Sequence, residues 1–94
     1  LQRVTLIDSL TTQVQEDGSK DIKLSTPPLE GMDIRWYRVG PQGKEVEIVE
    51  QAGQKEWTAS ANDQGVVRAK VAFRTPEVRK YDDKFQATRD FRLN

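Results

Sequence analysis

The side chains of this sequence that could transfer a proton are carboxylates, lysines and tyrosines, because the chain contains neither histidine nor cysteine. Thiol catalysis, imidazole catalysis, disulfides, and zinc or iron–sulfur sites built on those ligands are therefore excluded. The carboxylates are densest at Glu45 with Glu47 and at Asp82 with Asp83. Two carboxylates at a suitable separation could act as a general acid and a general base, as in glycoside hydrolysis.

Neither carboxylate pair has the arrangement that shared proton chemistry needs. In a strand, Glu45 and Glu47 lie on one face, where we expect them to point at solvent and to oppose edge-to-edge pairing. Asp82 and Asp83 are adjacent, so an extended chain directs them to opposite sides. The sequence also contains no P-loop, no dinucleotide-binding fingerprint and no G-x-S-x-G motif. We therefore predict a protein that is not an enzyme, with no catalytic residues and no cofactor.

Oxygen ligands for a cation occur at alternate positions of one predicted turn. Asp17, Ser19 and Asp21 could donate oxygens to calcium, but Gly18 and Lys20 break the order of an EF-hand loop. The Asp-Gly pair is also a strong signal for the turn of a β-hairpin. We predict the turn and no metal site, with calcium as the open alternative.

The elements that position these residues are strands, since polar and apolar residues alternate with period two and helical spacing is absent. Turn clusters at 16–19, 40–43 and 62–65 separate the alternating runs. About seven strands at a spacing of about 8 to 12 residues predict an all-β antiparallel sandwich. The expected extended segments are 4–10, 11–15, 22–26, 34–39, 45–49, 56–61, 67–73 and 84–93.

The apolar positions of these strands predict the core. Trp36 lies within an alternating strand, which is typical of a core tryptophan rather than of a stacking platform for a sugar or a base. Trp57 has polar neighbours in a shorter run, so a core position and a surface anchor are both open. The residues expected to face inward are Leu24, Trp36, Ile48, Val67, Ala69 and Val71.

Length and charge limit the organisation of the chain and its partners. Ninety-four residues suffice for one domain and not for two, so we expect a single domain over 1–94. The 15 basic residues offset the 15 acidic ones, which argues against nucleic acid as a partner. No apolar run approaches the roughly 20 residues of a membrane span. Because the chain begins at Leu1, we expect a module excised from a longer multi-domain protein, in contact with its neighbouring domains.

Two features together resemble an immunoglobulin domain. Trp36 lies in a strand twelve residues after Leu24, and the segment D-Q-G-V-V-R-A follows at 63–69. In that family a core tryptophan packs across a disulfide, and a D-x-G-x-Y-x-C motif opens the strand of the second cysteine. The resemblance implies that Leu24 and Ala69 replace the two half-cystines and that Val67 replaces the corner tyrosine.

The resemblance covers nearly the whole chain. Residues 11–24 look like the lead-in of intermediate-set immunoglobulin domains. The rhythm from Trp36 to Val71 is similar to the cysteine-free immunoglobulin-like repeats of bacterial surface proteins, phage decoration proteins and some cytoskeleton-associated proteins. This likeness implies a fold and a habit of protein contact, and it favours an extracellular, cell-surface or virion location over a cytoplasmic scaffold.

We predict a non-catalytic module for protein interaction, adhesion or scaffolding within a larger protein. Loops between sandwich strands commonly carry recognition, and the loop at 75–83 holds an aromatic residue among charges of both signs. An exposed strand edge is the other candidate surface. The alternatives are a passive spacer in a multi-domain array and a carbohydrate-binding sandwich. The candidate contact residues of the loop are Arg79, Lys80, Tyr81 and Asp82.

Overall fold

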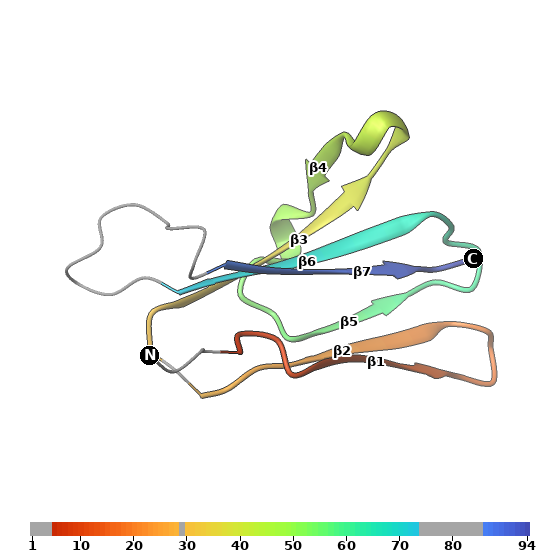
Figure 1. Cartoon of the computed structure of the whole chain (residues 1–94). Helices are drawn as coiled ribbons and strands as arrows, with labels where there is room; N and C mark the ends of the chain where they lie inside the picture. Colours follow the sequence, from red (N-terminus) through yellow and green to blue (C-terminus); the bar gives the residue numbers. More distant parts are fainter. Residues whose placement is uncertain (1–4, 29, 74–85) are drawn as a thin grey trace.

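In the part of the chain that the structure describes, seven strands form two antiparallel sheets that face each other as a β-sandwich (Figure 1). The structure is a computed structural model that describes residues 5–28, 30–73 and 86–94. The predicted all-β antiparallel sandwich is confirmed. The strands are β1 (Ser9–Val14), β2 (Lys20–Ser25), β3 (Met32–Val39), β4 (Glu45–Glu47), β5 (Glu56–Ala59), β6 (Val66–Phe73) and β7 (Gln86–Arg92). Two short 3₁₀ segments, η1 (Pro41–Gly43) and η2 (Val49–Gln51), flank β4.

The strands are shared unequally between the sheets. The smaller sheet has the order β1-β2-β5, and the larger sheet has the order β4-β3-β6-β7. The centre of the larger sheet is the long antiparallel pairing of β3 with β6, which runs from Met32 opposite Phe73 to Val39 opposite Val66. Within the described residues, β1 and β5 are therefore the edges of the smaller sheet, and β4 and β7 are the edges of the larger one.

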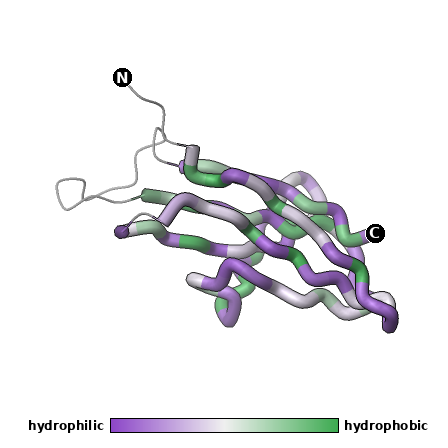
Figure 2. The backbone as a smooth tube through the Cα atoms, turned by 90° about the horizontal axis from the view of Figure 1, so that it is seen from below, coloured by the Kyte–Doolittle hydropathy of each residue, from purple (hydrophilic) through white to green (hydrophobic). Residues whose placement is uncertain are grey.

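The core lies between the sheets and is built from alternate residues of the strands. Figure 2 shows hydrophobic and hydrophilic residues alternating along the backbone, and β6 buries Val67, Ala69 and Val71 while the residues between them stay partly exposed. All six residues expected to face inward are buried in the structure. Further buried residues are Leu6, Ile7, Ile22, Ile34, Ala59 and Leu93.

Trp36 is the largest fully buried side chain. Its indole Nε1 donates a hydrogen bond to the backbone carbonyl of Gln54 at 2.7 Å, which satisfies its one polar group inside the core. The ring centre lies 6.2 Å from that of Trp57, with the planes tilted by 55°. Trp57 is partly buried and packs against the core cluster, so it lies at the margin of the core rather than standing free on the surface.

The N-terminal segment differs from the expectation. One strand, β1, spans the predicted boundary between 4–10 and 11–15, and the residues 5–8 before it are not in a strand. Leu6 and Ile7 are both buried there. Successive side chains of a strand point to opposite faces, so a segment that buries two neighbours on one core cannot be part of the ladder.

Val46 is exposed, although it lies only two residues before the buried Ile48. Ile48 is buried, but it lies just after β4, and Val46 is 57% exposed. Figure 1 shows β4 standing away from the smaller sheet, so the described strands of that sheet do not cover Val46.

Candidate protein-binding surfaces

The loop predicted to make contact, residues 75–83, lies outside the residues that the structure describes. Arg79, Lys80, Tyr81 and Asp82 therefore have no described position, and neither has the Asp83 carboxylate. The surfaces that can be built from described residues are the outer faces of the two sheets and the edges of their outermost strands.

The oxygens considered for calcium hold the β1–β2 turn together. Asp17 Oδ1 accepts hydrogen bonds from the hydroxyl of Ser19 at 2.6 Å and from its backbone N–H at 2.9 Å, and both lower the pKa of Asp17. Asp21 instead accepts from the Thr58 hydroxyl at 2.8 Å and from the amide of Gln15. The two carboxylates have separate partners, and the described residues contain no group of three Asp, Glu, His or Cys side chains suited to a metal ion.

Glu45 and Glu47 lie on the outer face of the larger sheet, and cations of neighbouring strands bind them. Glu47 accepts a hydrogen bond from Arg35 on β3 at 3.2 Å. Glu45 lies 2.7 Å from Lys70 and 3.7 Å from Arg68, both on β6. Both side chains lie on the outer face, as expected, and the sheet order places cations beside them there. They share a face, but they bind different cations and share no proton.

Arg68 and Asp90 join β6 to the edge strand β7. The register places the two residues opposite each other, and Arg68 Nε and Nη2 donate to the two Asp90 oxygens at 2.7 and 2.9 Å. These bonds lower the pKa of Asp90 and raise that of Arg68. Two residues further along β7, Arg92 is exposed and has no ion pair with any described residue. At β7, the described part of the outer face therefore ends in Asp90, which is paired, and Arg92, which has no described ion-pair partner.

Arg38 and Asp63 make a contact that the sequence did not reveal. Arg38 Nη1 and Nη2 donate to the Asp63 oxygens at 2.9 and 2.7 Å, and the guanidinium lies 5.4 Å from the ring centre of Trp57. The hydrogen bonds from Arg38 lower the pKa of Asp63. Through this side chain, β3 is tied to β5 and to the turn before β6. The partners are 25 residues apart, and no local spacing signals such a pair.

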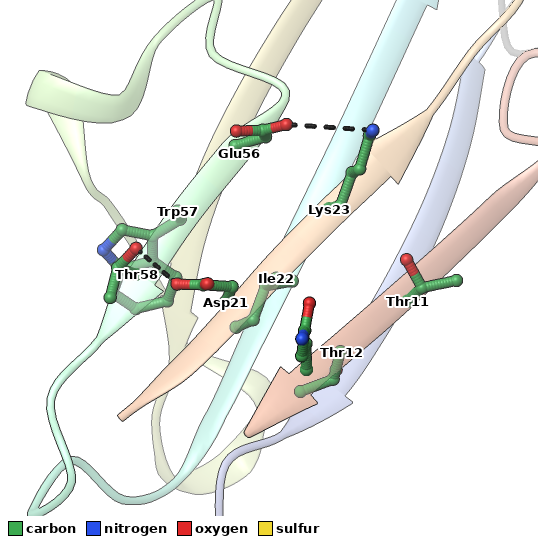
Figure 3. A pocket seen from close by; sticks show the side chains of 9 residues that line it. Thr11, Thr12, Asp21, Ile22, Lys23, Glu56, Trp57 and Thr58 are labelled. Atoms are coloured by element: carbon green, nitrogen blue, oxygen red, sulfur yellow. Dashed lines mark hydrogen bonds and ion pairs between the residues drawn. The ribbon is translucent and has the colours of Figure 1, made fainter. Parts of the chain in front are cut away.

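A hollow lies over β1, β2 and β5 on the smaller sheet (Figure 3). Polar side chains meet across it, with Thr58 bound to Asp21 and Lys23 lying 3.9 Å from Glu56. Trp57 contributes to the lining, but its ring already contacts Trp36 and Arg38 inside the sandwich. These two pairs occupy four of the polar side chains that line the hollow, which leaves fewer groups for a ligand.

Among the described strands, the edge strand β7 has the longest backbone without a second strand beside it. It has seven residues, against six in β1, four in β5 and three in β4. The N–H of Leu93 donates to the carbonyl of Gly65 at 2.7 Å. Since backbone groups alternate in an antiparallel pair, residues 87, 89 and 91 bond to β6. The residues whose N–H and C=O point away from the sheet are Gln86, Thr88, Asp90 and Arg92.

Comparison with protein-family models, with curated proteins and with solved structures finds no match. Among the described residues, no helix has the length and apolarity to cross a membrane. A function for this chain must therefore be argued from its own geometry.

Proposed function

We propose that this chain is an immunoglobulin-like module that binds another protein, without catalysis, through the free edge of β7. The strand order supports the immunoglobulin-like class. In such sandwiches the first, second and fifth strands of this numbering share one sheet, and the third, sixth and seventh share the other. Here β1, β2 and β5 form one sheet, while β3, β6 and β7 form the other with β4 added beside β3.

The residues at the positions of the missing disulfide also support this class. Leu24 is buried on β2, in the smaller sheet, and Ala69 is buried on β6, in the larger sheet. Trp36 lies opposite Ala69 in the β3–β6 register, so the core tryptophan is next to the position of the second half-cystine. Apolar contact then takes the place of a covalent link that is commonly worth about 2–4 kcal/mol.

The observation that carries the binding proposal is the unpaired backbone of β7. An extended segment of a partner can add to such an edge as a further strand, where main-chain hydrogen bonds supply affinity and alternate side chains supply specificity. β7 contains no proline, and its outward N–H groups are free of described partners. The larger sheet would gain its fifth strand from the partner.

The proposal is tested by selecting extended peptides from a displayed library against the whole chain. Selected peptides are titrated against the wild type, Thr88→Pro and Thr88→Ala. The proline removes one outward N–H and no bond to β6, and an edge strand tolerates it. Losing one backbone hydrogen bond, worth about 1–1.5 kcal/mol, predicts about tenfold weaker binding to Thr88→Pro. Thr88→Ala keeps the N–H and should bind as the wild type does.

A second variant tests the loop. If the peptides bind Thr88→Pro normally but fail to bind a variant with Arg79, Lys80, Tyr81 and Asp82 changed to serine, the loop is the contact and the β7 assignment is wrong. If no peptide binds the wild type at tens of micromolar, the protein-binding proposal fails and the passive spacer takes its place.

A further inference from the structure

We propose that the protein that adds to β7 is a second copy of this chain, paired antiparallel through the same edge around a two-fold axis at Phe91. This inference rests on the proposed function, because it names the occupant of the β7 edge. Only backbone groups that point away from β6 can bond across such an interface. In a symmetric pair, residues whose backbone groups point away from β6 in one copy therefore face the same kind of residue in the other copy. The residue that lies on the two-fold axis defines the register.

Charge distinguishes the registers centred on residues 89 to 92. An axis at Arg89 or at Arg92 places that arginine opposite itself, and an axis at Asp90 places two aspartates opposite each other. Like charges directly opposite each other destabilise a strand pair. An axis at Phe91 instead places Asp90 of each copy opposite Arg92 of the other, so that two opposite-charge pairs form by symmetry. Of these four registers, it alone avoids a like-charge contact.

The side chains of the outer face suit this register. Arg92 is exposed and has no ion pair among the described residues, so it is free to bind a carboxylate of the second copy. Asp90 already accepts from Arg68, but a carboxylate has about four acceptor positions and can take a second cation. Each Asp90–Arg92 pair across the interface would therefore continue the Arg68–Asp90 ion pair that joins β6 to β7.

Phe91 suits the axis position on the inner side. It is partly buried and packs against the core at the edge of the sheet. At the axis it belongs to a non-hydrogen-bonded pair, in which the two side chains approach most closely. The two phenylalanines would cover each other's exposed parts, and the two larger sheets would join as one sheet of eight strands.

The other long edge, β1, lacks the features that specify such a pairing. Its six residues, Ser9–Val14, carry no charged side chain. A strand without charges can pair in several registers with similar energies, because nothing penalises the wrong ones. β7 has the longer backbone, and its charges favour the register centred on Phe91 over those centred on Arg89, Asp90 and Arg92.

Sedimentation equilibrium of the whole chain, from micromolar to millimolar concentration, tests self-pairing. An edge of this length gives a small interface, below about 1,200 Å², so we expect a reversible dimer at the upper end of that range. Asp90→Arg and Arg92→Asp each place like charges opposite each other at both pairs. Each variant alone should dimerise about tenfold more weakly or worse. An equal mixture of the two variants should recover the dimer, because every altered position then faces the opposite charge.

Two controls keep the result decisive. Arg89→Asp makes the same charge change on the same strand but outside the Asp90–Arg92 pairs, and it should leave dimerisation unchanged. Arg92→Asp breaks no ion pair within the described residues of one copy, so it remains informative even if Asp90→Arg unfolds, which a thermal melt would reveal.

The outcomes separate this inference from the proposed function. A wild type that stays monomeric at millimolar concentration overturns self-pairing. Peptide binding that is weakened by Thr88→Pro would still support the β7 edge as the binding surface. A dimer that is insensitive to the charge variants overturns the register. If the wild type stays monomeric and peptide binding does not respond to Thr88→Pro, both proposals fail.

Discussion

Arg35 and Trp36 are neighbours on β3, and they belong to opposite faces of the larger sheet. Trp36 is fully buried, whereas the Arg35 side chain is 48% exposed and is held by Asp33 and Glu47. The same alternation runs along β6, where Ala69 is buried and Lys70 pairs with Glu45. One set of strands thus carries an apolar layer inside and a layer of ion pairs outside.

The two layers contribute very different free energies of folding. A large aromatic side chain removed from a core costs about 3–5 kcal/mol, but an exposed ion pair contributes about 0.2–1 kcal/mol. Substitutions on the outer face therefore leave the fold nearly intact. That freedom would let the outer face and its edge at β7 specify the partner that we propose, while the inner face maintains the sandwich.

The largest expected effect is on the inner face. Trp36→Ala should lower the free energy of unfolding by about 3–5 kcal/mol, because it removes the largest buried side chain and leaves a cavity. Tyr37→Ala, the next residue and on the outer face, is the matched control and should cost about 1 kcal/mol. Urea denaturation measures both. Equal losses from the two variants would show that the faces do not differ as described.

A smaller effect is expected at the end of the core, where Arg38 binds Asp63. Asp63→Asn should cost about 0.5–1 kcal/mol at neutral pH, because this partly exposed pair is screened by solvent. Arg38 lowers the pKa of folded Asp63 below the unfolded value of about 3.9. The pair therefore stabilises the fold above that pH and loses its effect as the pH falls through the folded pKa.

Urea unfolding at neutral pH and at about pH 3 measures this dependence on the Asp63 carboxylate. The wild type should lose more stability on acidification than Asp63→Asn, which has no carboxylate to protonate at this position. Equal losses would mean that Asp63 does not contribute to the acid sensitivity of the fold.

The smallest effect is expected on the outer face itself. Arg35→Gln removes the contacts with Asp33 and Glu47, and the free energy of unfolding should change by less than about 0.5 kcal/mol. Added salt should reduce even that difference, because exposed charges are screened over about 8–10 Å. A loss above about 1.5 kcal/mol in urea denaturation would assign the outer face a structural role.

The sequence predicted which side chains point into the core better than it predicted which side chains contact each other. Alternation identified the inward residues of β6, and the Asp-Gly signal identified the β1–β2 turn, where Gly18 has a φ of +88°. It did not reveal the Arg38–Asp63 contact or the cations beside Glu45, because those depend on which strands become neighbours. Sheet order is decided by packing between distant segments, and local spacing does not encode it.

The sequence predicted the type of the candidate surface, an exposed strand edge or a loop, but not its full location. An exposed strand edge was one of two expected contact surfaces, and the place of the run 84–93 at the C-terminus suits a strand near an edge. The outward groups of Thr88, Asp90 and Arg92 follow only from the register of β7 with β6, which the sequence does not encode locally.

Amide hydrogen exchange along β7 tests the central claim, that this edge is an unpaired backbone which binds an added strand. In dilute solution the amides of Ala87, Arg89 and Phe91 should exchange slowly because they bond to β6, while those at 88, 90 and 92 should exchange fast. At millimolar concentration, or with a selected peptide bound, the second set should become protected as well. If the amides at 88, 90 and 92 are already protected in dilute solution, or stay fast under every condition, the account of β7 as a binding edge is contradicted.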